Sequence, residues 1–442
     1  MQQLSTDIDE DRQPPLSIPF AHFVVGVAVL LFGGGVAGLG SFLPGVDPAG
    51  AGSLHLLLAG WVGLTIMGAM TQFVPVWSGT AIHSRRLSIG SLWLVTIGLA
   101  GLVAGFFTHN YGWLPGGGLC LAVGFWVFAY NIARTLPPAR SLDITEAHFV
   151  FALGSLVVGS GLGVLLASEY AGHGLTGWID PSRLVVAHPT VTVFGFVLTT
   201  IVGALYQLVP MFTQAETTAL DTRLAHVEMV ALPGGVTMLA AGRLIGSDAL
   251  ATLGASGLLL GSFAVGLFVV HQLWTARVEA GPLLRRYWLV AISLLGWVIL
   301  TVPYWLANPL TLFGRFGNPA GTHLLFVGVF MMTIIGTFYH VVPFIIWYHR
   351  YSDRLGYESV PMVDDLYDDR LATVEFWLLV VGLGSLWLGD LLAVPTWVIA
   401  LGGNLLGVAV LLFGINMTMI VWNHRPETLG EVCGVLVGRI DG

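Results

Sequence analysis

The sequence predicts an all-helical membrane protein with about twelve transmembrane helices, on the basis of three observations. The 442 residues are 55% hydrophobic and only 10% charged, whereas soluble globular chains carry about 25% charged residues. Apolar stretches of about 20 residues, long enough to cross a bilayer, recur from residue 19 to residue 422. One sequence motif returns in three of these stretches. This pattern excludes a string of soluble domains.

Short loops separate the apolar stretches, so we expect a single membrane domain over residues 19–425, between polar tails at 1–18 and 426–442. The first tail is acidic and lacks the basic flank of a signal peptide, so the first stretch should be retained. The net charge is −8, and we expect no nucleic-acid partner. The predicted spans cover 19–43, 53–78, 88–108, 113–136, 146–168, 184–211, 225–245, 249–275, 287–307, 322–347, 372–392 and 394–422.

The arginines predict the orientation of the spans. The chain has no lysine, so its 17 basic residues are all arginines. If both termini face the cytoplasm, fourteen arginines lie on the cytoplasmic side and three on the outer side. Cytoplasmic loops of membrane proteins are enriched in basic residues. The sequence therefore predicts an N-in, C-in topology, in the plasma (inner) membrane.

Spans 2, 6 and 10 share one motif. Residues 55–77 read HLLLAGWVGLTIMGAMTQFVPVW, residues 190–212 read TVTVFGFVLTTIVGALYQLVPMF, and residues 323–345 read HLLFVGVFMMTIIGTFYHVVPFI. Two glycines and a Val-Pro pair align in all three. Because the motif returns every fourth span, we expect three four-helix units, near 19–136, 146–275 and 287–422, arranged with pseudo-threefold symmetry.

Histidines begin two of these segments and predict a cofactor site. His55 and His323 occupy the same position of the motif. In the second segment that position is Thr190, and His188 lies two residues before it. All three are expected near the outer face. Two histidines at one depth on different helices are what a low-spin, six-coordinate haem b requires. We therefore expect His55 and His323 to be axial haem ligands, with His188 as a candidate ligand of a second metal.

The three outer arginines are candidate partners for haem propionates, because guanidinium groups pair well with carboxylates. These arginines are Arg183, Arg243 and Arg315.

Nearly the whole chain resembles subunit I of the haem–copper oxidase superfamily, which includes cytochrome oxidases and nitric oxide reductases. The resemblance rests on twelve spans with the motifs of spans 2 and 10, and on His-Pro-Thr-Val at 188–191, which is similar to the family's His-Pro-Glu-Val. It implies that His55 and His323 match low-spin haem ligands. It also implies that His188 matches a histidine that binds copper or non-haem iron.

Several positions depart from that family. Gly321 stands where the ligand of a second haem is expected, Thr190 replaces an acid, and no His-His pair occurs near the outer end of span 7. These departures predict that the binuclear centre is incomplete. The acids near the ends of spans, Glu146, Glu228 and Glu375, are expected to be solvated at the cytoplasmic surface.

A shorter resemblance is to the NnrS-like membrane haem proteins associated with nitric oxide stress. The matching residues lie in and just after span 2: His55, Gly60, Pro75, Trp77 and Gly79.

Together these observations predict a haem b protein in respiratory-type electron transfer or in the handling of nitric oxide or oxygen. Its expected partners are membrane lipid, an outer electron donor (a small copper protein, a cytochrome or quinol) and another membrane subunit. One alternative is an active nitric oxide reductase or terminal oxidase, with a second haem, copper or non-haem iron at His188. Another is a transporter or channel without a cofactor. No catalytic residue is assigned.

Overall fold

The computed structural model describes residues 15–39, 50–174, 177, 179–279, 281–424 and 434. Within them, twelve helical spans are long and apolar enough to cross a membrane, and no strand longer than an isolated bridge occurs. The predictions of an all-helical chain and of a multi-pass membrane protein are therefore confirmed. The predicted polar tails fall largely outside the described residues, at 1–14, 426–433 and 435–442.

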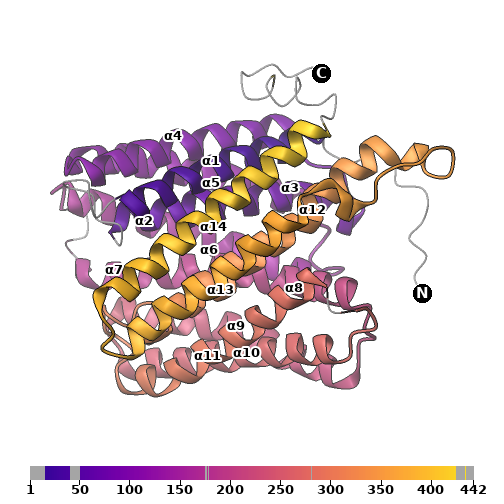
Figure 1. Ribbon diagram of the computed structural model, residues 1–442. Coiled ribbons are helices and arrows are strands. Elements are labelled where there is room, and N and C mark those ends of the chain that lie inside the picture. The colour runs from indigo at the N-terminus through magenta and orange to yellow at the C-terminus, as the bar shows by residue number, and fades with distance from the viewer. Residues whose placement is uncertain are drawn as a thin grey trace.

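The helices follow the predicted order, with bounds that differ by a few residues. They are α1 (Ser17–Leu39), α2 (Ala51–His55), α3 (Gly63–Ser78), α4 (Arg85–Phe107), α5 (Leu114–Thr135), α6 (Ile144–Tyr170), α7 (Pro181–Pro189), α8 (Thr199–Thr213), α9 (Ala219–Ile245), α10 (Asp248–Trp274), α11 (Pro282–Ala307), α12 (Met332–Tyr351), α13 (Asp369–Leu391) and α14 (Thr396–Asn423) (Figure 1).

Polar side chains fix where several helices begin. Asp143 accepts a hydrogen bond from the backbone of Glu146 and the Glu146 side chain accepts one in return, which starts α6. Thr218 and Asp221 do the same at α9. These reciprocal bonds satisfy backbone N–H groups that a helix leaves free at its first turn. They place both starts upstream of the predicted spans, which were read from hydrophobicity alone.

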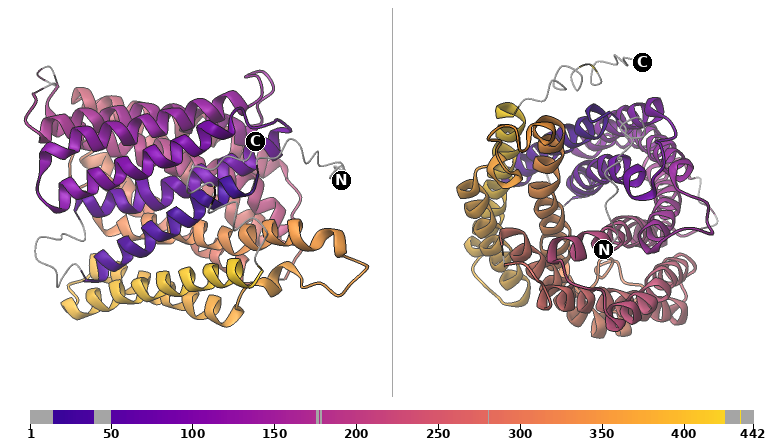
Figure 2. Two further views of the ribbon diagram at one scale, coloured as in Figure 1. Left: turned by 90° about the horizontal axis from the view of Figure 1, so that it is seen from above. Right: turned by 90° about the vertical axis from the view of Figure 1, so that its right-hand side faces the viewer.

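The helices form a closed ring. Each membrane span packs against the next span in sequence, and α14 packs against α1. Figure 2 shows the bundle along the helices in its right-hand view, with the chain running around it. Three antiparallel pairs, α4 with α5, α9 with α10 and α13 with α14, make the most extensive contacts.

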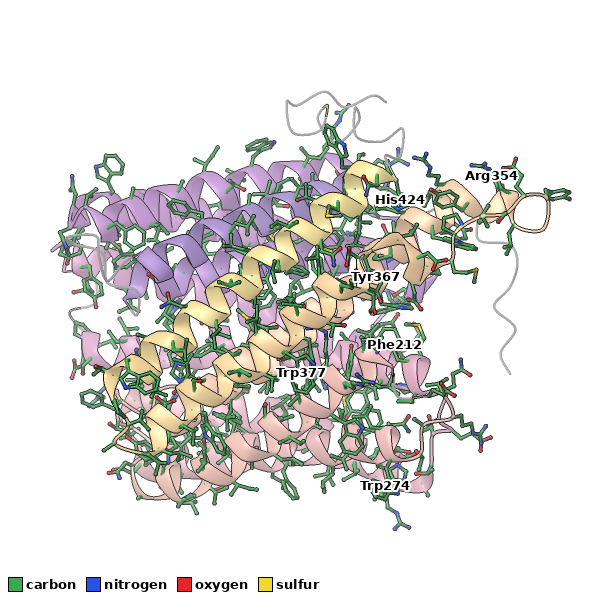
Figure 3. The ribbon with its side chains drawn as sticks, in the orientation of Figure 1. Phe212, Trp274, Arg354, Tyr367, Trp377 and His424 are labelled. Atoms are coloured by element: carbon green, nitrogen blue, oxygen red, sulfur yellow. The ribbon has the colours of Figure 1, made fainter. Side chains whose placement is uncertain are left out.

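Spans 2, 6 and 10 are the most deeply buried. Their most apolar windows are 67%, 83% and 83% buried, whereas the windows of the other spans are 28–61% buried. The three spans that share the motif therefore form the inner wall of the ring. Outward-facing side chains such as Trp274 and Trp377, which are 80% and 55% exposed, lie on the periphery (Figure 3).

Each of these inner spans contains a π-helical segment in its N-terminal half. The segments are η2 (Leu56–Val62), η4 (Thr190–Leu198) and η6 (Leu324–Met331). π-helical turns are rare and occur often at functional sites. Here each segment begins one or two residues after a histidine, namely His55, His188 or His323.

Aligned glycines in spans 2, 6 and 10 admit close neighbours from spans 1, 5 and 9. A Cβ added at Gly68 would lie 2.9 Å from His22 Cβ, and one at Gly203 would lie 2.7 Å from His148 Cβ. At Gly336 the nearest atom would be Arg286 Cδ, at 3.2 Å. Small residues permit this close helix packing in membranes.

The aligned prolines lie inside helices and do not end them at once. Pro75 and Pro210 each lie three residues before the end of α3 and α8, whereas α12 continues for eight residues beyond Pro343, to Tyr351.

Candidate functional site

A cavity of about 400 Å³ lies between α2, α4, α5, α6 and α7, at the ends of the spans that carry His55 and His188. We call it the outer cavity, after the predicted orientation. Both histidines line it, together with Arg315 from the loop after α11 and Tyr170 from the end of α6. The rest of its wall is mainly aliphatic and aromatic, which suits a large, mostly apolar ligand with a few polar groups.

The backbone holds both cavity histidines in one tautomer. His55 Nδ1 lies 2.7 Å from the carbonyl oxygen of Ala51, one turn earlier. His188 Nδ1 lies 2.8 Å from the carbonyl oxygen of Gly159 in α6. A carbonyl oxygen only accepts, so each Nδ1 carries the proton and each Nε2 keeps its lone pair. Metal-binding histidines are commonly oriented by this kind of bond.

The two imidazoles form a pair across the cavity. Their ring centres are 6.3 Å apart and their planes differ by 16°. The His55 ring also lies against Phe106, with ring centres 5.7 Å apart. The His188 ring needs the absence of a side chain at Gly163, where an added Cβ would lie 3.0 Å from His188 Cε1.

His323 has different surroundings. Its Nδ1 lies 2.5 Å from Asp390 Oδ2, near the end of α13, and the two side chains are 35% and 24% exposed. His323 does not line the outer cavity. The structure therefore brings His55 to His188 and His323 to Asp390. The sequence-based pairing of His55 with His323 stays a prediction.

The three predicted propionate partners differ in what they bind. Arg315 lines the outer cavity, and partial burial lowers the pKa of its guanidinium from the ordinary value. Arg183 is exposed and donates to the carbonyl oxygen of Ile245, 2.8 Å away. Of the three, only Arg315 is therefore positioned to meet a ligand in the outer cavity.

Arg243 is buried and donates four hydrogen bonds to neutral oxygens. It donates to the carbonyl oxygens of Pro309, Gly314 and Arg315 at 2.9, 3.1 and 3.1 Å, and to Thr190 Oγ1 at 2.7 Å. These bonds tie the loop that carries Arg315 to span 6, two residues beyond His188. Arg243 is thus a positioning residue for the cavity wall and not a direct ligand of its contents.

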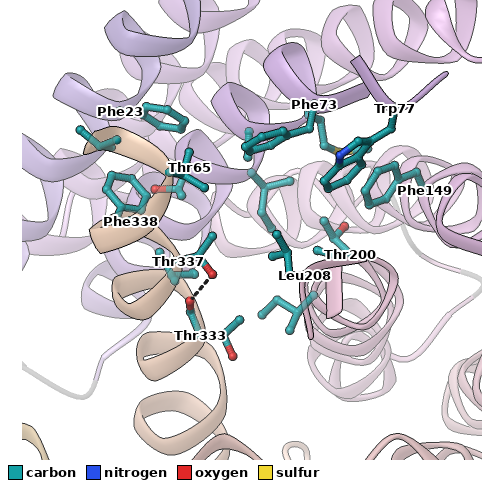
Figure 4. Close-up of a pocket in the computed structure, with 18 residues that line it drawn as sticks. Phe23, Thr65, Phe73, Trp77, Phe149, Thr200, Leu208, Thr333, Thr337 and Phe338 are labelled. Atoms are coloured by element: carbon teal, nitrogen blue, oxygen red, sulfur yellow. Dashed lines mark hydrogen bonds between the residues drawn. The ribbon is translucent and has the colours of Figure 1, made fainter. Parts of the chain in front are cut away.

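A second, smaller cavity of about 90 Å³ lies between the inner spans. Thr65, Thr200 and Thr333, which align in the three motif segments, all line it, among aromatic and aliphatic side chains (Figure 4). This cavity contains no ionisable side chain among its lining residues, so we assign it no chemistry.

The prediction that three acids are solvated is wrong. Glu146 is 5% exposed, and Glu228 and Glu375 are both 0% exposed. Each has a close polar partner: Ser78 for Glu146, His148 for Glu228 and Arg286 for Glu375. Burial of an acid is tolerated when it is paired. Sequence reasoning missed these pairs, although ionisable residues within apolar spans are a functional signal in themselves.

Comparison with models of known protein families found no match, and no curated protein matched the chain.

Proposed function

We propose that this chain is a membrane haem b protein in which one low-spin haem occupies the outer cavity, with His55 and His188 as its axial ligands. The observation that carries the proposal is the parallel imidazole pair. Metal–nitrogen bonds to histidine are about 2.0–2.1 Å long, so two imidazoles on one metal place their ring centres about 6 Å apart. The observed 6.3 Å fits that requirement.

The cavity wall also suits this group. Carbonyl acceptors at both Nδ1 atoms leave both Nε2 atoms as ligands. Phe106, Phe125 and Phe196 provide apolar surface for a porphyrin, and Arg315 supplies a cation for a propionate. Bound haem would supply reversible one-electron transfer. The residues of the chain would hold it, fix its orientation and exclude lipid.

We further propose three four-helix units in a pseudo-threefold arrangement, with both termini in the cytoplasm. The matched glycine contacts of His22, His148 and Arg286 support equivalent units, as do the three π-helical segments. The fourteen-to-three distribution of arginines supports the orientation. The haem would then lie near the outer face of the plasma membrane. It would be within reach of a small copper protein, a cytochrome or quinol as donor, and a partner membrane subunit would complete the path.

The proposed role is respiratory-type electron transfer or the handling of nitric oxide or oxygen. In the alternative, a nitric oxide reductase or terminal oxidase, His188 would bind a separate metal and would not share one iron with His55. A transporter or channel without a cofactor is the remaining alternative.

A reduced-minus-oxidised visible spectrum of the purified protein, with haem and metal quantified, tests the proposal. We expect a sharp low-spin b-type signal and about one haem per chain. Two haems, or haem with copper or iron and a spectral shift on adding carbon monoxide, would favour the reductase or oxidase. Protein that contains no haem after expression with ample haem would exclude both haem-based functions.

A further inference from the structure

A closed polar cluster lies inside the bundle, away from the outer cavity. His148 Nε2 lies 2.9 and 3.0 Å from the two carboxylate oxygens of Glu228. The hydroxyl of Tyr206 donates to Glu228 Oε2 at 3.1 Å. The side chains of His148 and Glu228 are both 0% exposed. We call these three residues the histidine cluster.

The hydrogen bonds of the histidine cluster leave one proton free to move. His148 Nδ1 lies 2.6 Å from the carbonyl oxygen of Ile144, which can only accept, so Nδ1 keeps its hydrogen. A second proton can sit on Nε2, facing a carboxylate, or on Glu228, facing a neutral imidazole. Both arrangements leave the cluster with no net charge, which is the inexpensive state for buried groups.

A second cluster lies where Arg286 packs against Gly336 of α12, which is the position that corresponds to the packing of His148 against Gly203 of α8. Arg286 Nη2 lies 2.5 Å from Glu375 Oε2, and both side chains are buried. The guanidinium carbon of Arg286 lies 5.2 Å from the ring centre of Tyr339, which aligns with Tyr206 in the motif. We call Arg286, Glu375 and Tyr339 the arginine cluster. Arginine does not lose its proton in proteins, so the guanidinium of this pair stays charged.

The first four-span group has only part of this arrangement. His22 packs against Gly68 in the same way that His148 packs against Gly203. The residue that aligns with Tyr206 is Thr71, and His22 Nε2 is buried without a hydrogen-bond partner among the described residues. The positions that pack against Gly68, Gly203 and Gly336 thus differ. The first carries His22, whose Nε2 has no partner among the described residues; the second carries His148, paired with Glu228; and the third carries Arg286, paired with Glu375.

We propose that the histidine cluster is a proton-binding site, and that the arginine cluster is its non-titrating counterpart. Binding forms the Nε2–H bond of His148 with a proton from water and changes the cluster charge from −1 to 0. Release breaks that bond and leaves the Glu228 carboxylate unneutralised. Because Arg286 keeps its protons, the arginine cluster undergoes no equivalent change.

Polar groups lie near the histidine cluster on the side where α6 begins. Gln207, next to Tyr206, donates to the exposed Asp143 at the start of α6, 3.3 Å away. Among the described residues, Asp221 in α9 also lies near Tyr206 of the cluster. Asp221 is paired with His271 in α10, with 2.9 Å between Oδ1 and Nδ1. Protons would therefore exchange from the side on which α6 begins, which is the predicted cytoplasmic side.

Infrared difference spectra of the purified protein at a series of pH values, in H₂O and D₂O, test this inference without any need for bound haem. We expect wild-type protein to show a coupled histidine–carboxylate titration of the His148–Glu228 pair, in addition to any signal from the His271–Asp221 and His323–Asp390 pairs. His148→Arg should remove it, because the substitution copies the arginine cluster. The reciprocal Arg286→His should add a second titration of the same kind.

Only variants that elute and unfold as the wild type does are compared. If His148→Arg does not fold, Glu228→Gln is measured in its place and should also remove the titration. Spectra of the measured variant that match those of the wild type at every pH would overturn the inference. The His271–Asp221 and His323–Asp390 pairs are present in both proteins, so only the His148–Glu228 pair differs between them. Because none of these readouts depends on haem, failure here is distinct from failure of the proposed haem site.

Discussion

The N-terminal ends of spans 2 and 6 differ from the N-terminal end of span 10. In the first two, an imidazole is fixed by a backbone carbonyl and faces a second imidazole across a cavity. In span 10, His323 is bound to Asp390 and lies outside that cavity. Equal places in a sequence motif therefore do not give equal surroundings. The helices that pack around each histidine decide which histidines can bind one ligand together.

The largest expected effect separates these two regions directly. His55→Ala and His188→Ala should each abolish the low-spin haem signal, because six-coordinate haem needs both axial ligands. His323→Ala should leave that signal in place. Visible spectra of the three purified variants provide the measurement. Loss of the signal in His323→Ala, with retention in His188→Ala, would instead support the pairing of His55 with His323.

Removing the buried cation beside the outer cavity should have the next largest effect. Arg243→Gln deletes hydrogen bonds to three carbonyl oxygens and one hydroxyl and should lower the free energy of unfolding by about 3 kcal/mol. Thermal unfolding in detergent measures this loss. The exposed Arg183→Gln is the matched control and should change stability by less than about 0.5 kcal/mol. Equal effects of the two substitutions would contradict the positioning role of Arg243.

A smaller effect is expected at Arg315, which faces the cavity. Arg315→Gln should weaken haem binding by about 1 kcal/mol, the scale of a partly exposed ion pair, with little change in fold stability. Haem titration of apoprotein gives the affinity, again with Arg183→Gln as control. An unchanged affinity would show that Arg315 does not pair with a propionate.

The smallest effect belongs to span 10. Asp390→Asn should lower stability by at most about 1 kcal/mol, because the pair with His323 is partly solvated and exposed ion pairs contribute little. The difference from wild type should shrink in high salt. Unfolding measured at two salt concentrations tests this, and a loss of several kcal/mol would indicate a tighter role for this pair.

The number and order of the helices could be predicted from the sequence, because about 20 apolar residues in a row allow few other structures. The residues at which helices begin were harder to predict. The helix α9 begins at Ala219, six residues before the predicted span. The Thr218–Asp221 capping box determines this start, and a prediction from hydrophobicity alone does not detect it.

The candidate site was only partly predictable. His55 and His188 were recognisable as histidines near the outer end of the bundle. Their pairing depends on which helices enclose a common cavity, and motif alignment instead favours the two histidines at equal positions. The buried partners of Glu228 and Glu375 lie 80 and 89 residues away along the chain. Without knowledge of those contacts, acids near the ends of spans are indistinguishable from solvated ones.

The surroundings of Arg243 have a consequence for the electrostatic potential of the molecule. Its four partners are all uncharged oxygens, so no carboxylate neutralises it among the contacts of the described residues. In a medium of low dielectric constant, the field of an unneutralised charge extends over many ångströms. Arg243 therefore contributes a positive potential to the neighbouring outer cavity. An electron added there, or an occupant with net negative charge, is stabilised before any direct contact is made.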